Sequence, residues 1–354
     1  MELVEFAQQA VDAVIRPPRR EYDLFTFPTL LKTTDGYQYQ RYPINFVNNR
    51  NQKIVGSIYK DVSSDIMSGG PCVIYLHGNA SSQIEGLFLI PNLCQYGITV
   101  YLFDNAGCGQ SEGDYISLGL FESEDVRFIL YNLEANFNLR PFILWGRSMG
   151  AASAIMTHYP SVSGIIVDST FSTLYDLILS ITKAMKFPSL IGKISVFFLN
   201  MSVKDCAGFD IKDVSPLKYA KMPCNPPMIM GHAIDDDFIP FSQAKEIFEN
   251  YSNLDKIFVE LSKGHNGNRS HKWYKICFDF IFEKLNLRPL GFIIRKFKGM
   301  QTSSHFSDAM DMIQYQERDE PGESIIGDNR CIESLLNCRF FTSSDEDEND
   351  EQIA

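Results

Sequence analysis

The chain alternates short apolar runs with amphipathic segments over most of its length. Runs typical of buried strands cover residues 72–76, 98–103, 142–145, 164–167, 228–230 and 257–261. Segments with helical spacing of apolar residues lie near residues 83–96, 122–136, 151–156, 242–250 and 273–285. Strands that are apolar on both faces and alternate with helices indicate an α/β fold with a mostly parallel sheet and helices on both faces. Ligand sites in such sheets lie at the carboxyl ends of the strands.

Three further patterns lie outside this repeat. Residues 3–14 have helical spacing, and Pro17 and Pro18 end that helix. Residues 42–47 and 53–59 predict a hairpin. Residues 171–221 interrupt the alternation with a helical cap insertion rich in Leu, Ile and Phe. We expect this insertion to lie over the active site as a lid, with ordinary core packing of extra helices as the alternative.

Length, composition and charge give the domain organisation. Of the 354 residues 45% are hydrophobic, enough for one large α/β domain. We predict an N-terminal amphipathic helix and Pro/Arg segment over residues 1–26, the α/β domain over residues 27–290, and an acidic, disordered tail over residues 291–354. Residues 301–354 hold 14 Asp or Glu and 3 Arg, so the tail carries most of the net charge of −12. A nearly neutral body argues against a nucleic-acid partner, which needs a clustered basic face.

The cysteines, the N-terminal residues and the longest uncharged stretch bear on the cellular location of the protein. The eight cysteines, at positions 72, 94, 108, 206, 224, 277, 331 and 338, form no Cys-x-x-Cys pair, which favours free thiols in a reducing compartment. The first fifteen residues lack the basic start of a secretory signal. Pro91 and Gly97 interrupt the longest uncharged stretch, residues 86–103, so it is not expected to span a membrane. We expect a cytoplasmic protein, with peripheral membrane contact as an alternative.

A Gly-x-Ser-x-Gly motif lies between a predicted strand and a predicted helix. Gly146, Ser148 and Gly150 follow the apolar run 142–145 and precede the helical segment 151–156. Glycine flanks the serine because a side chain there would collide with the neighbouring strand or helix. The turn would expose the serine oxygen at a helix N-terminus, where developing negative charge is favoured. Ser148 is therefore the candidate nucleophile.

A serine nucleophile needs a base and an orienting carboxylate. Of the six histidines, His265 alone follows the last predicted strand, where the chain order Ser, Asp, His places the base. His77 is expected to be a structural turn residue instead. The candidate acids are Asp235, Asp236 and Asp237, which follow the strand at 228–230 and which spacing alone does not separate.

The reaction also needs two donors for the negatively charged oxygen of the tetrahedral intermediate. The backbone amide of Met149, directly after the serine, is one candidate. The turn formed by His77, Gly78 and Asn79 supplies the second, the amide of Asn79. Because both donors belong to the backbone, substitution of the Asn79 side chain need not abolish activity.

Four ordered motifs resemble those of the α/β-hydrolase superfamily. They are His-Gly-Asn at 77–79, Gly-x-Ser-x-Gly at 146–150, His-x-x-x-Asp at 232–236 and Gly-His-Asn at 264–266. The resemblance covers residues 42–287 and is to the branch of serine aminopeptidase S33-type, or abhydrolase-domain, proteins. The segments YLHGNASS, FDNAGCGQSEGDYISLG, LWGRSMGAASA and KGHNGNRS look most like a plant and protist subgroup. The resemblance implies the α/β-hydrolase fold.

The resemblance also assigns roles to residues. It implies that Ser148 is the nucleophile, His265 the base and Asp236 the acid, with the amides of Asn79 and Met149 as the oxyanion hole. Ala233 stands where the family usually has Gly. For that reason Asp235 and Asp237 stay open as alternatives.

The sequence thus predicts a serine hydrolase that uses no metal and no organic cofactor. An apolar insertion suits an acyl chain, so we expect a small-molecule or acylated substrate with an ester or thioester bond. One alternative is an S33-type aminopeptidase, a reading that rests on likeness of fold. The other is a non-catalytic interaction protein that keeps the fold and binds partners through its acidic tail.

Overall fold

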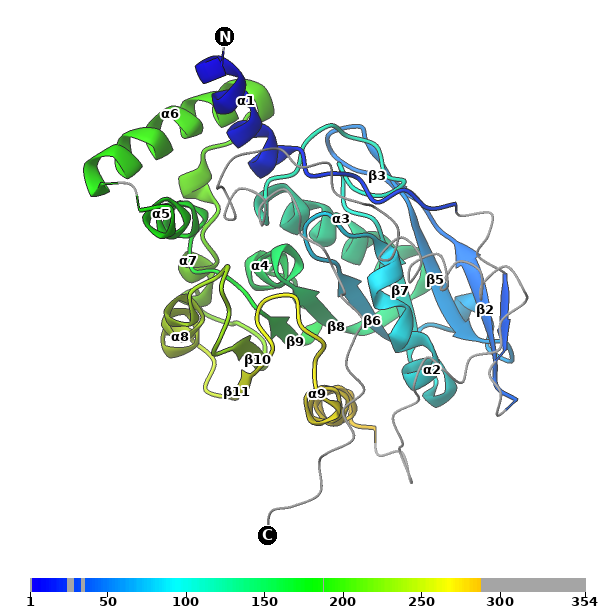
Figure 1. The fold of residues 1–354 in the computed structure, drawn as a ribbon. Helices are drawn as coiled ribbons and strands as arrows, with labels where there is room; N and C mark the ends of the chain where they lie inside the picture. Colours follow the sequence, from blue (N-terminus) through cyan, green and yellow to red (C-terminus); the bar gives the residue numbers. More distant parts are fainter. Residues whose placement is uncertain (1, 24–28, 33–35, 187, 288–354) are drawn as a thin grey trace.

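A nine-stranded sheet forms the centre of the molecule (Figure 1). The computed structural model describes residues 2–23, 29–32, 36–186 and 188–287; the predicted tail lies outside the described residues. The strand order is β1-β2-β5-β7-β6-β8-β9-β10-β11. The strands of this sheet are β1 (Leu30–Lys32), β2 (Gln38–Pro43), β5 (Gly56–Asp61), β7 (Thr99–Phe103), β6 (Gly70–Leu76), β8 (Leu139–Arg147), β9 (Val162–Asp168), β10 (Met228–Ala233) and β11 (Lys256–Leu261).

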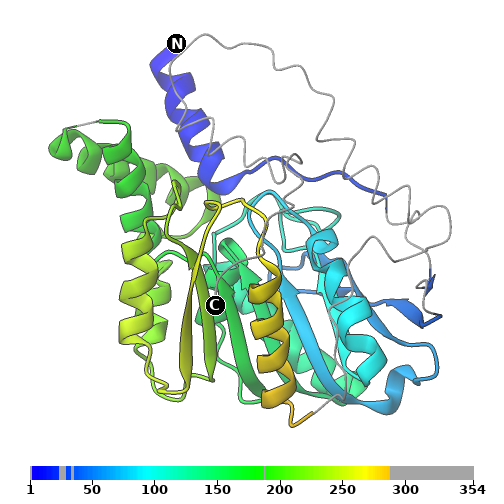
Figure 2. The same ribbon diagram turned by 60° about the horizontal axis from the view of Figure 1, so that its bottom comes forward.

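The strands from β7 to β11 in this order run parallel, and β1, β2 and β5 add an antiparallel edge. Helices cover both faces, as predicted. The short helix α2 (Ile90–Leu93) and the long helix α9 (His271–Lys284) lie on one face. Helices α3 (Leu120–Phe137), α4 (Met149–Met156) and α8 (Phe241–Asn250) lie on the other (Figures 1 and 2).

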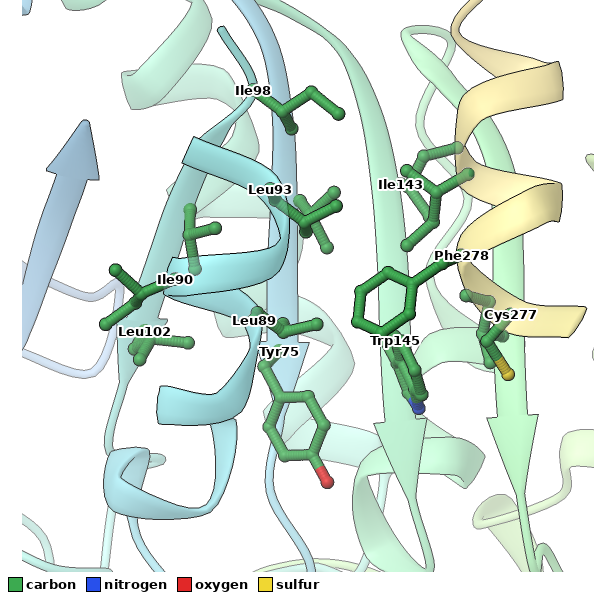
Figure 3. Packing of buried hydrophobic residues seen from close by; sticks show 14 of the residues in the cluster. Tyr75, Leu89, Ile90, Leu93, Ile98, Leu102, Ile143, Trp145, Cys277 and Phe278 are labelled. Carbon is green, nitrogen blue, oxygen red and sulfur yellow. The ribbon is translucent and has the colours of Figure 1, made fainter. Parts of the chain in front are cut away.

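Alternation along the strands divides the core into two layers. In β8, Trp145 and Ile143 pack under α2 and α9, whereas Leu144 and Phe142 pack under α3 and α4. Figure 3 shows the first layer, where Trp145 lies close to Phe278 of α9, with ring centroids 5.7 Å apart. All four strand residues are buried, which explains why the strands read as continuous apolar runs.

Two predicted elements are divided in the structure. The helix expected near residues 83–96 consists of 3₁₀ turns at Gln83–Leu89 and Cys94–Tyr96 on either side of α2. Pro91 lies at the start of α2 and has no N–H to continue a helix from the preceding turn. The expected strand 42–47 is likewise divided, because β2 ends at Pro43 and β3 begins at Phe46 (Phe46–Val47). The predicted hairpin still forms in two parts: β3 pairs with β4 (Lys53–Ile54), and the end of β2 pairs antiparallel with β5.

The insertion at 171–221 forms a helical cap. It contains α5 (Leu174–Ala184), α6 (Ser189–Ala207), a 3₁₀ turn at Ile211–Asp213 and α7 (Pro216–Ala220). Helix α1 (Glu2–Ile15) lies against α6 and buries Val11, Val14 and Ile15 in the same apolar cluster as α5 (Figure 1). The cluster also includes Ala152 and Met156 of α4, so the cap rests on the helix that follows Ser148.

The cysteines and the helices bear on the predicted compartment. Within the described ranges Cys72, Cys94, Cys108, Cys206, Cys224 and Cys277 are free thiols, and Cys331 and Cys338 lie outside them. Among the helices of the described part of the chain, none has the length and apolar character needed to cross a bilayer.

Candidate active site

Ser148 lies at the apex of the turn between β8 and α4. Its φ of 51° and ψ of −116° are strained for a residue with a side chain. A Cβ on Gly146 would lie 2.1 Å from the carbonyl oxygen of Gly150, and a Cβ on Gly150 would lie 1.9 Å from that of Leu76. The two glycines therefore let α4 approach both β8 and β6 closely enough to form the turn.

We expect Gly150→Ala to lower both stability and activity, because the new methyl group meets backbone and α4 must move away from β6. Overpacking of this kind typically costs about 1–3 kcal/mol. The free energy of unfolding in urea and the rate of ester hydrolysis measure the two effects. Gly97→Ala is the control, since its Cβ would meet open space and only its φ of 77° is strained. Full activity in Gly150→Ala would contradict this account of the turn.

The structure brings Ser148, His265 and Asp236 together from three loops. Ser148 follows β8, Asp236 follows β10 and His265 follows β11, so all three lie at the carboxyl ends of parallel strands. The distance from Ser148 Oγ to His265 Nε2 is 3.1 Å, and that from His265 Nδ1 to Asp236 Oδ2 is 2.9 Å. Both are hydrogen-bond distances in the order that a nucleophile, a base and an orienting acid require. Ser148 and His265 are 7% and 4% exposed.

The carboxylate of Asp236 is held from several sides. Its Oδ1 accepts hydrogen bonds from the backbone amides of Phe238 and Ile239, at 3.0 and 2.7 Å. Burial favours the neutral acid, but the hydrogen bonds from His265 and the Ile239 amide outweigh it, and the pKa of Asp236 is lowered from its ordinary value. Asp236 is therefore ionised at neutral pH, as a partner for an imidazolium must be.

His232, at the end of β10, lies next to the carboxylate of Asp236. Its Nε2 lies 3.0 Å from the carbonyl oxygen of Ile239 and 3.3 Å from Asp236 Oδ2. A carbonyl only accepts, so Nε2 carries the hydrogen. Burial lowers the pKa of His232, which keeps this ring neutral. The pattern His-x-x-x-Asp thus places a buried imidazole N–H next to the acid.

The two neighbouring aspartates lie differently. Asp235 and Asp237 are exposed, and Asp235 Oδ1 accepts a hydrogen bond from the amide of Gly264 at 3.1 Å. Of these three aspartates, Asp236 alone hydrogen-bonds to the imidazole of His265 in the described residues. The structure therefore places Asp236 next to His265, whereas the sequence spacing did not distinguish among the three aspartates.

His77 orients the loop that follows β6. Its Nε2 accepts from the backbone amide of Asn105 at 3.0 Å, so Nδ1 carries the hydrogen and donates to the carbonyl of Gly78 at 2.7 Å. The carbonyl and the N–H of a trans peptide point in opposite directions. By holding the Gly78 carbonyl, His77 thus also fixes the direction of the Asn79 N–H. The second candidate donor, the amide of Met149, is the first of α4 and has no acceptor within the helix.

Two buried arginines hold the loop that carries His265. Arg147, beside Ser148, donates to the carbonyl of His265 at 3.2 Å and forms a 3.2 Å ion pair with Glu85. Glu85 also accepts a hydrogen bond from the amide of Gly78 at 3.0 Å. The ion pair between Arg147 and Glu85 thus connects the turn of Ser148 with the loops that carry His265 and Asn79.

The second arginine acts from the other side of the loop. Arg269 forms a 2.9 Å ion pair with Asp168 at the end of β9. It also donates to the carbonyls of Gly264, His265 and Gly267 at 3.0–3.1 Å. The Arg269 guanidinium offsets the cost of burial and lowers the pKa of Asp168. The sequence patterns did not predict either ion pair. Their only signal in the sequence was a charged residue at the end of an apolar strand, at Arg147 and Asp168.

We expect Arg147→Gln to destabilise the protein by about 3–5 kcal/mol, because Glu85 would be left as a buried charge without its partner. Both side chains of this pair are 9% exposed. The control is Lys275→Gln, which removes a 2.7 Å pair with Asp279 whose side chains are 60% and 55% exposed. That change should cost less than about 1 kcal/mol. Urea unfolding measures the free energy of unfolding of both variants. Equal, small losses of stability would show that the buried pair of Arg147 and Glu85 does not hold the site.

No metal centre accompanies these residues in the part of the chain that the structure describes. No group of three or more His, Cys, Asp or Glu side chains there could hold a metal ion.

Sequence comparisons relate the chain to known hydrolases. Residues 71–213 match the family described as serine aminopeptidase, S33. An uncharacterized protein of Bacillus subtilis, YqkD, is 26% identical over 220 residues, which cover 59% of this chain and 70% of that protein. The lysophosphatidylserine lipase ABHD12 of Xenopus tropicalis is 25% identical over 186 residues, covering 50% of this chain and 46% of that protein. The chain therefore spans only about half the length of this lipase.

Solved structures share the fold. The esterase Pf2001 of Pyrococcus furiosus aligns with a TM-score of 0.56 and 18% identity, covering 77% of this chain and 97% of the esterase. Acetyl xylan esterase 1 of Thermoanaerobacterium aligns with a TM-score of 0.52 and 15% identity, covering 80% and 93%. These likenesses show that the chain has the α/β-hydrolase fold, in agreement with the match of residues 71–213. That match is to the S33 family, and the plant and protist subgroup stays a prediction.

Proposed function

We propose that the protein is a serine hydrolase that cleaves an acyl ester or thioester through Ser148, His265 and Asp236. The observation that carries this proposal is the pair of hydrogen bonds, 3.1 Å and 2.9 Å long, that join the three side chains at a strained turn. Serine is a weak nucleophile at neutral pH, and an adjacent oriented imidazole is what activates it. Arg147 and Arg269 support the proposal, because both donate hydrogen bonds to the backbone carbonyl of His265 and so hold this residue in place.

The reaction proceeds in two halves. Ser148 Oγ attacks the carbonyl carbon while His265 Nε2 takes its proton, and Asp236 stabilises the imidazolium. The amides of Asn79 and Met149 hold the negatively charged oxygen of the tetrahedral intermediate. The intermediate collapses to an acyl-enzyme as His265 returns the proton to the leaving alcohol or thiol. Water then attacks the acyl-enzyme with the same help, which releases the carboxylic acid and restores Ser148.

The cap supports an acylated substrate. Leu174, Leu177 and Ile178 of α5 form an apolar cluster with Ala152 of the helix that follows Ser148. The transfer of an acyl chain from water to apolar surroundings is favourable, so a cap built of apolar side chains suits an acylated substrate better than a charged one. The names of the relatives and of the structural neighbours, a lysophosphatidylserine lipase and esterases, agree with this choice. The cytoplasmic location stays a prediction.

An aminopeptidase is the second candidate. The matched family is described as serine aminopeptidase, and a proline iminopeptidase of Saccharolobus solfataricus is 32% identical over 111 residues, which cover 29% of this chain and 34% of that enzyme. The third candidate, a non-catalytic interaction protein, would have no use for the hydrogen bond between His265 and Ser148.

A substrate panel on the purified protein separates the three candidates. We expect turnover of p-nitrophenyl acyl esters and of acyl thioesters, with little turnover of amino-acid p-nitroanilides. The control is Ser148→Ala, which should turn over none of them. A preference for the anilides would replace the ester proposal with the peptidase. No turnover of any substrate by the folded wild type would favour the interaction protein.

A further inference from the structure

Helix α6 of the cap carries a row of bulky apolar side chains in solvent. Leu190 is 71% exposed, and Phe197 and Phe198 are each 60% exposed. Ile191, Ile194 and Met201 of the same helix are 47–49% exposed. Apolar residues that are exposed singly need no explanation, but a contiguous group of this size marks an interaction surface.

The exposed residues occupy one side of the helix. At 100° per residue, the six side chains fall within an arc of about 120°, the width of the apolar side of an amphipathic helix. The opposite side is already used, because Val196 and Val203 are buried in the cap core with α1 and α5. Figure 1 shows α6 at the periphery of the molecule, with α1 and α5 beside it. Helix α6 thus has two apolar sides, one of which faces outward.

The charge beside the N-terminal part of this side is positive, whereas at its C-terminal end Asp205 is exposed and Lys204 is paired with Asp210. Residues 177–204 contain four lysines and no Asp, Glu or Arg, whereas the whole chain has a net charge of −12. Lys183 and Lys186 lie at the corner between α5 and α6, Lys193 lies in α6, and all three are exposed. Exposed lysines beside an apolar surface are complementary to a surface that is both apolar and anionic.

We propose that this side of α6 docks the protein on a membrane surface that carries anionic lipids. A helix with Leu, Ile and Phe on one side and Lys at its border lies in the plane of the bilayer, with its apolar side among the upper acyl chains. The lysines then lie at the level of the negative headgroups, which attract them. The charge favours a bilayer over a second copy of the chain, because a bilayer with anionic lipids offers negative groups to the exposed Lys183, Lys186 and Lys193 together.

The position of α6 gives docking a consequence for the active site. The cap core to which α6 contributes Val196 and Val203 also contains Ala152 and Ile239, which lie near Ser148 and Asp236 in the chain. Docking through α6 would therefore hold the cap against the lipid layer. Because the cap core also contains Ala152 of α4, the turn of Ser148 would be held near the membrane together with the cap. The inference concerns attachment alone and does not depend on which bond the enzyme cleaves.

Vesicle sedimentation tests the proposal on the full chain. We use Ser148→Ala protein, so that no lipid is hydrolysed, with vesicles of phosphatidylcholine alone or of phosphatidylcholine with phosphatidylserine. Binding should be stronger to the second kind. A Phe197→Ser/Phe198→Ser variant should lose at least about tenfold in partition coefficient, since burial of each ring contributes more than that factor. Lys186→Gln/Lys193→Gln should weaken binding only to the vesicles that contain phosphatidylserine.

The control is Leu254→Ser/Ile257→Ser, which removes two apolar side chains that are 90% and 49% exposed outside the cap. It should bind as the unchanged protein does. Urea unfolding of each variant, followed by circular dichroism, shows whether the fold is intact. Equal binding of the control and the phenylalanine variant would overturn the proposal. So would a dimer in solution that the phenylalanine variant dissociates, because this surface would then belong to a second copy.

Discussion

Replacing Ser148 with alanine is expected to lower kcat for ester hydrolysis by about a millionfold, with little change in the fold. Loss of the nucleophile, or of its base in His265→Ala, removes a step that the remaining groups cannot perform. The double variant should lose no more than either single one, because the 3.1 Å hydrogen bond makes the two side chains one functional unit. Steady-state kinetics with a p-nitrophenyl ester measure all three variants.

Ser153 supplies the matched control. It is a buried serine one turn along α4, and its Oγ donates to the carbonyl of Met149 at 2.8 Å. Ser153→Ala should keep kcat within about tenfold, because the neutral helical hydrogen bond it removes is worth about 1 kcal/mol. A Ser148→Ala protein that kept more than about a hundredth of the wild-type rate would show that the nucleophile lies elsewhere.

Asp236→Asn is expected to lower kcat by about 10⁴-fold. The carboxylate accepts a 2.9 Å hydrogen bond from His265 Nδ1, which leaves Nε2 free to take the proton of Ser148. An amide in its place can donate to Nδ1 instead, and the imidazole then presents the wrong tautomer to the serine. The lowered pKa of Asp236 keeps the carboxylate ionised through neutral pH, so the loss should persist across that range.

The neighbouring aspartates are the controls for this prediction. Asp235→Asn and Asp237→Asn should each change kcat by less than about tenfold, because both side chains are exposed and neither hydrogen-bonds to His265 in the described residues. The same assay at neutral pH decides. A larger loss in either of these variants than in Asp236→Asn would move the role of the acid to that residue.

Much of the architecture could be predicted from local patterns. Parallel strands that are buried on both faces read as apolar runs, so the strands ending near Leu76, Arg147 and Ala233 were found within a few residues. The order of the chain then placed Ser148 and His265 at one edge of the sheet. The choice among three aspartates needed family spacing, because consecutive residues in a loop have no periodicity to separate them.

The supporting contacts could not be predicted in this way. Glu85 and Arg147 are 62 residues apart, and Asp168 and Arg269 are 101 residues apart. Such pairs depend on how distant loops meet after folding, which composition and periodicity do not encode. The exposed side of α6 could not be predicted either. The sequence pattern was compatible with a lid and with ordinary core packing, and only the tertiary contacts show which side of the helix is covered.

Labelling with a fluorophosphonate, followed by peptide mass spectrometry, tests the activated serine most directly. The probe forms a stable bond only with a serine that a neighbouring base has made nucleophilic. We predict a single adduct, on the peptide that contains Ser148, which is absent in Ser148→Ala and greatly slowed in His265→Ala. A folded wild-type protein that stays unlabelled, or an adduct on another residue, would contradict the account.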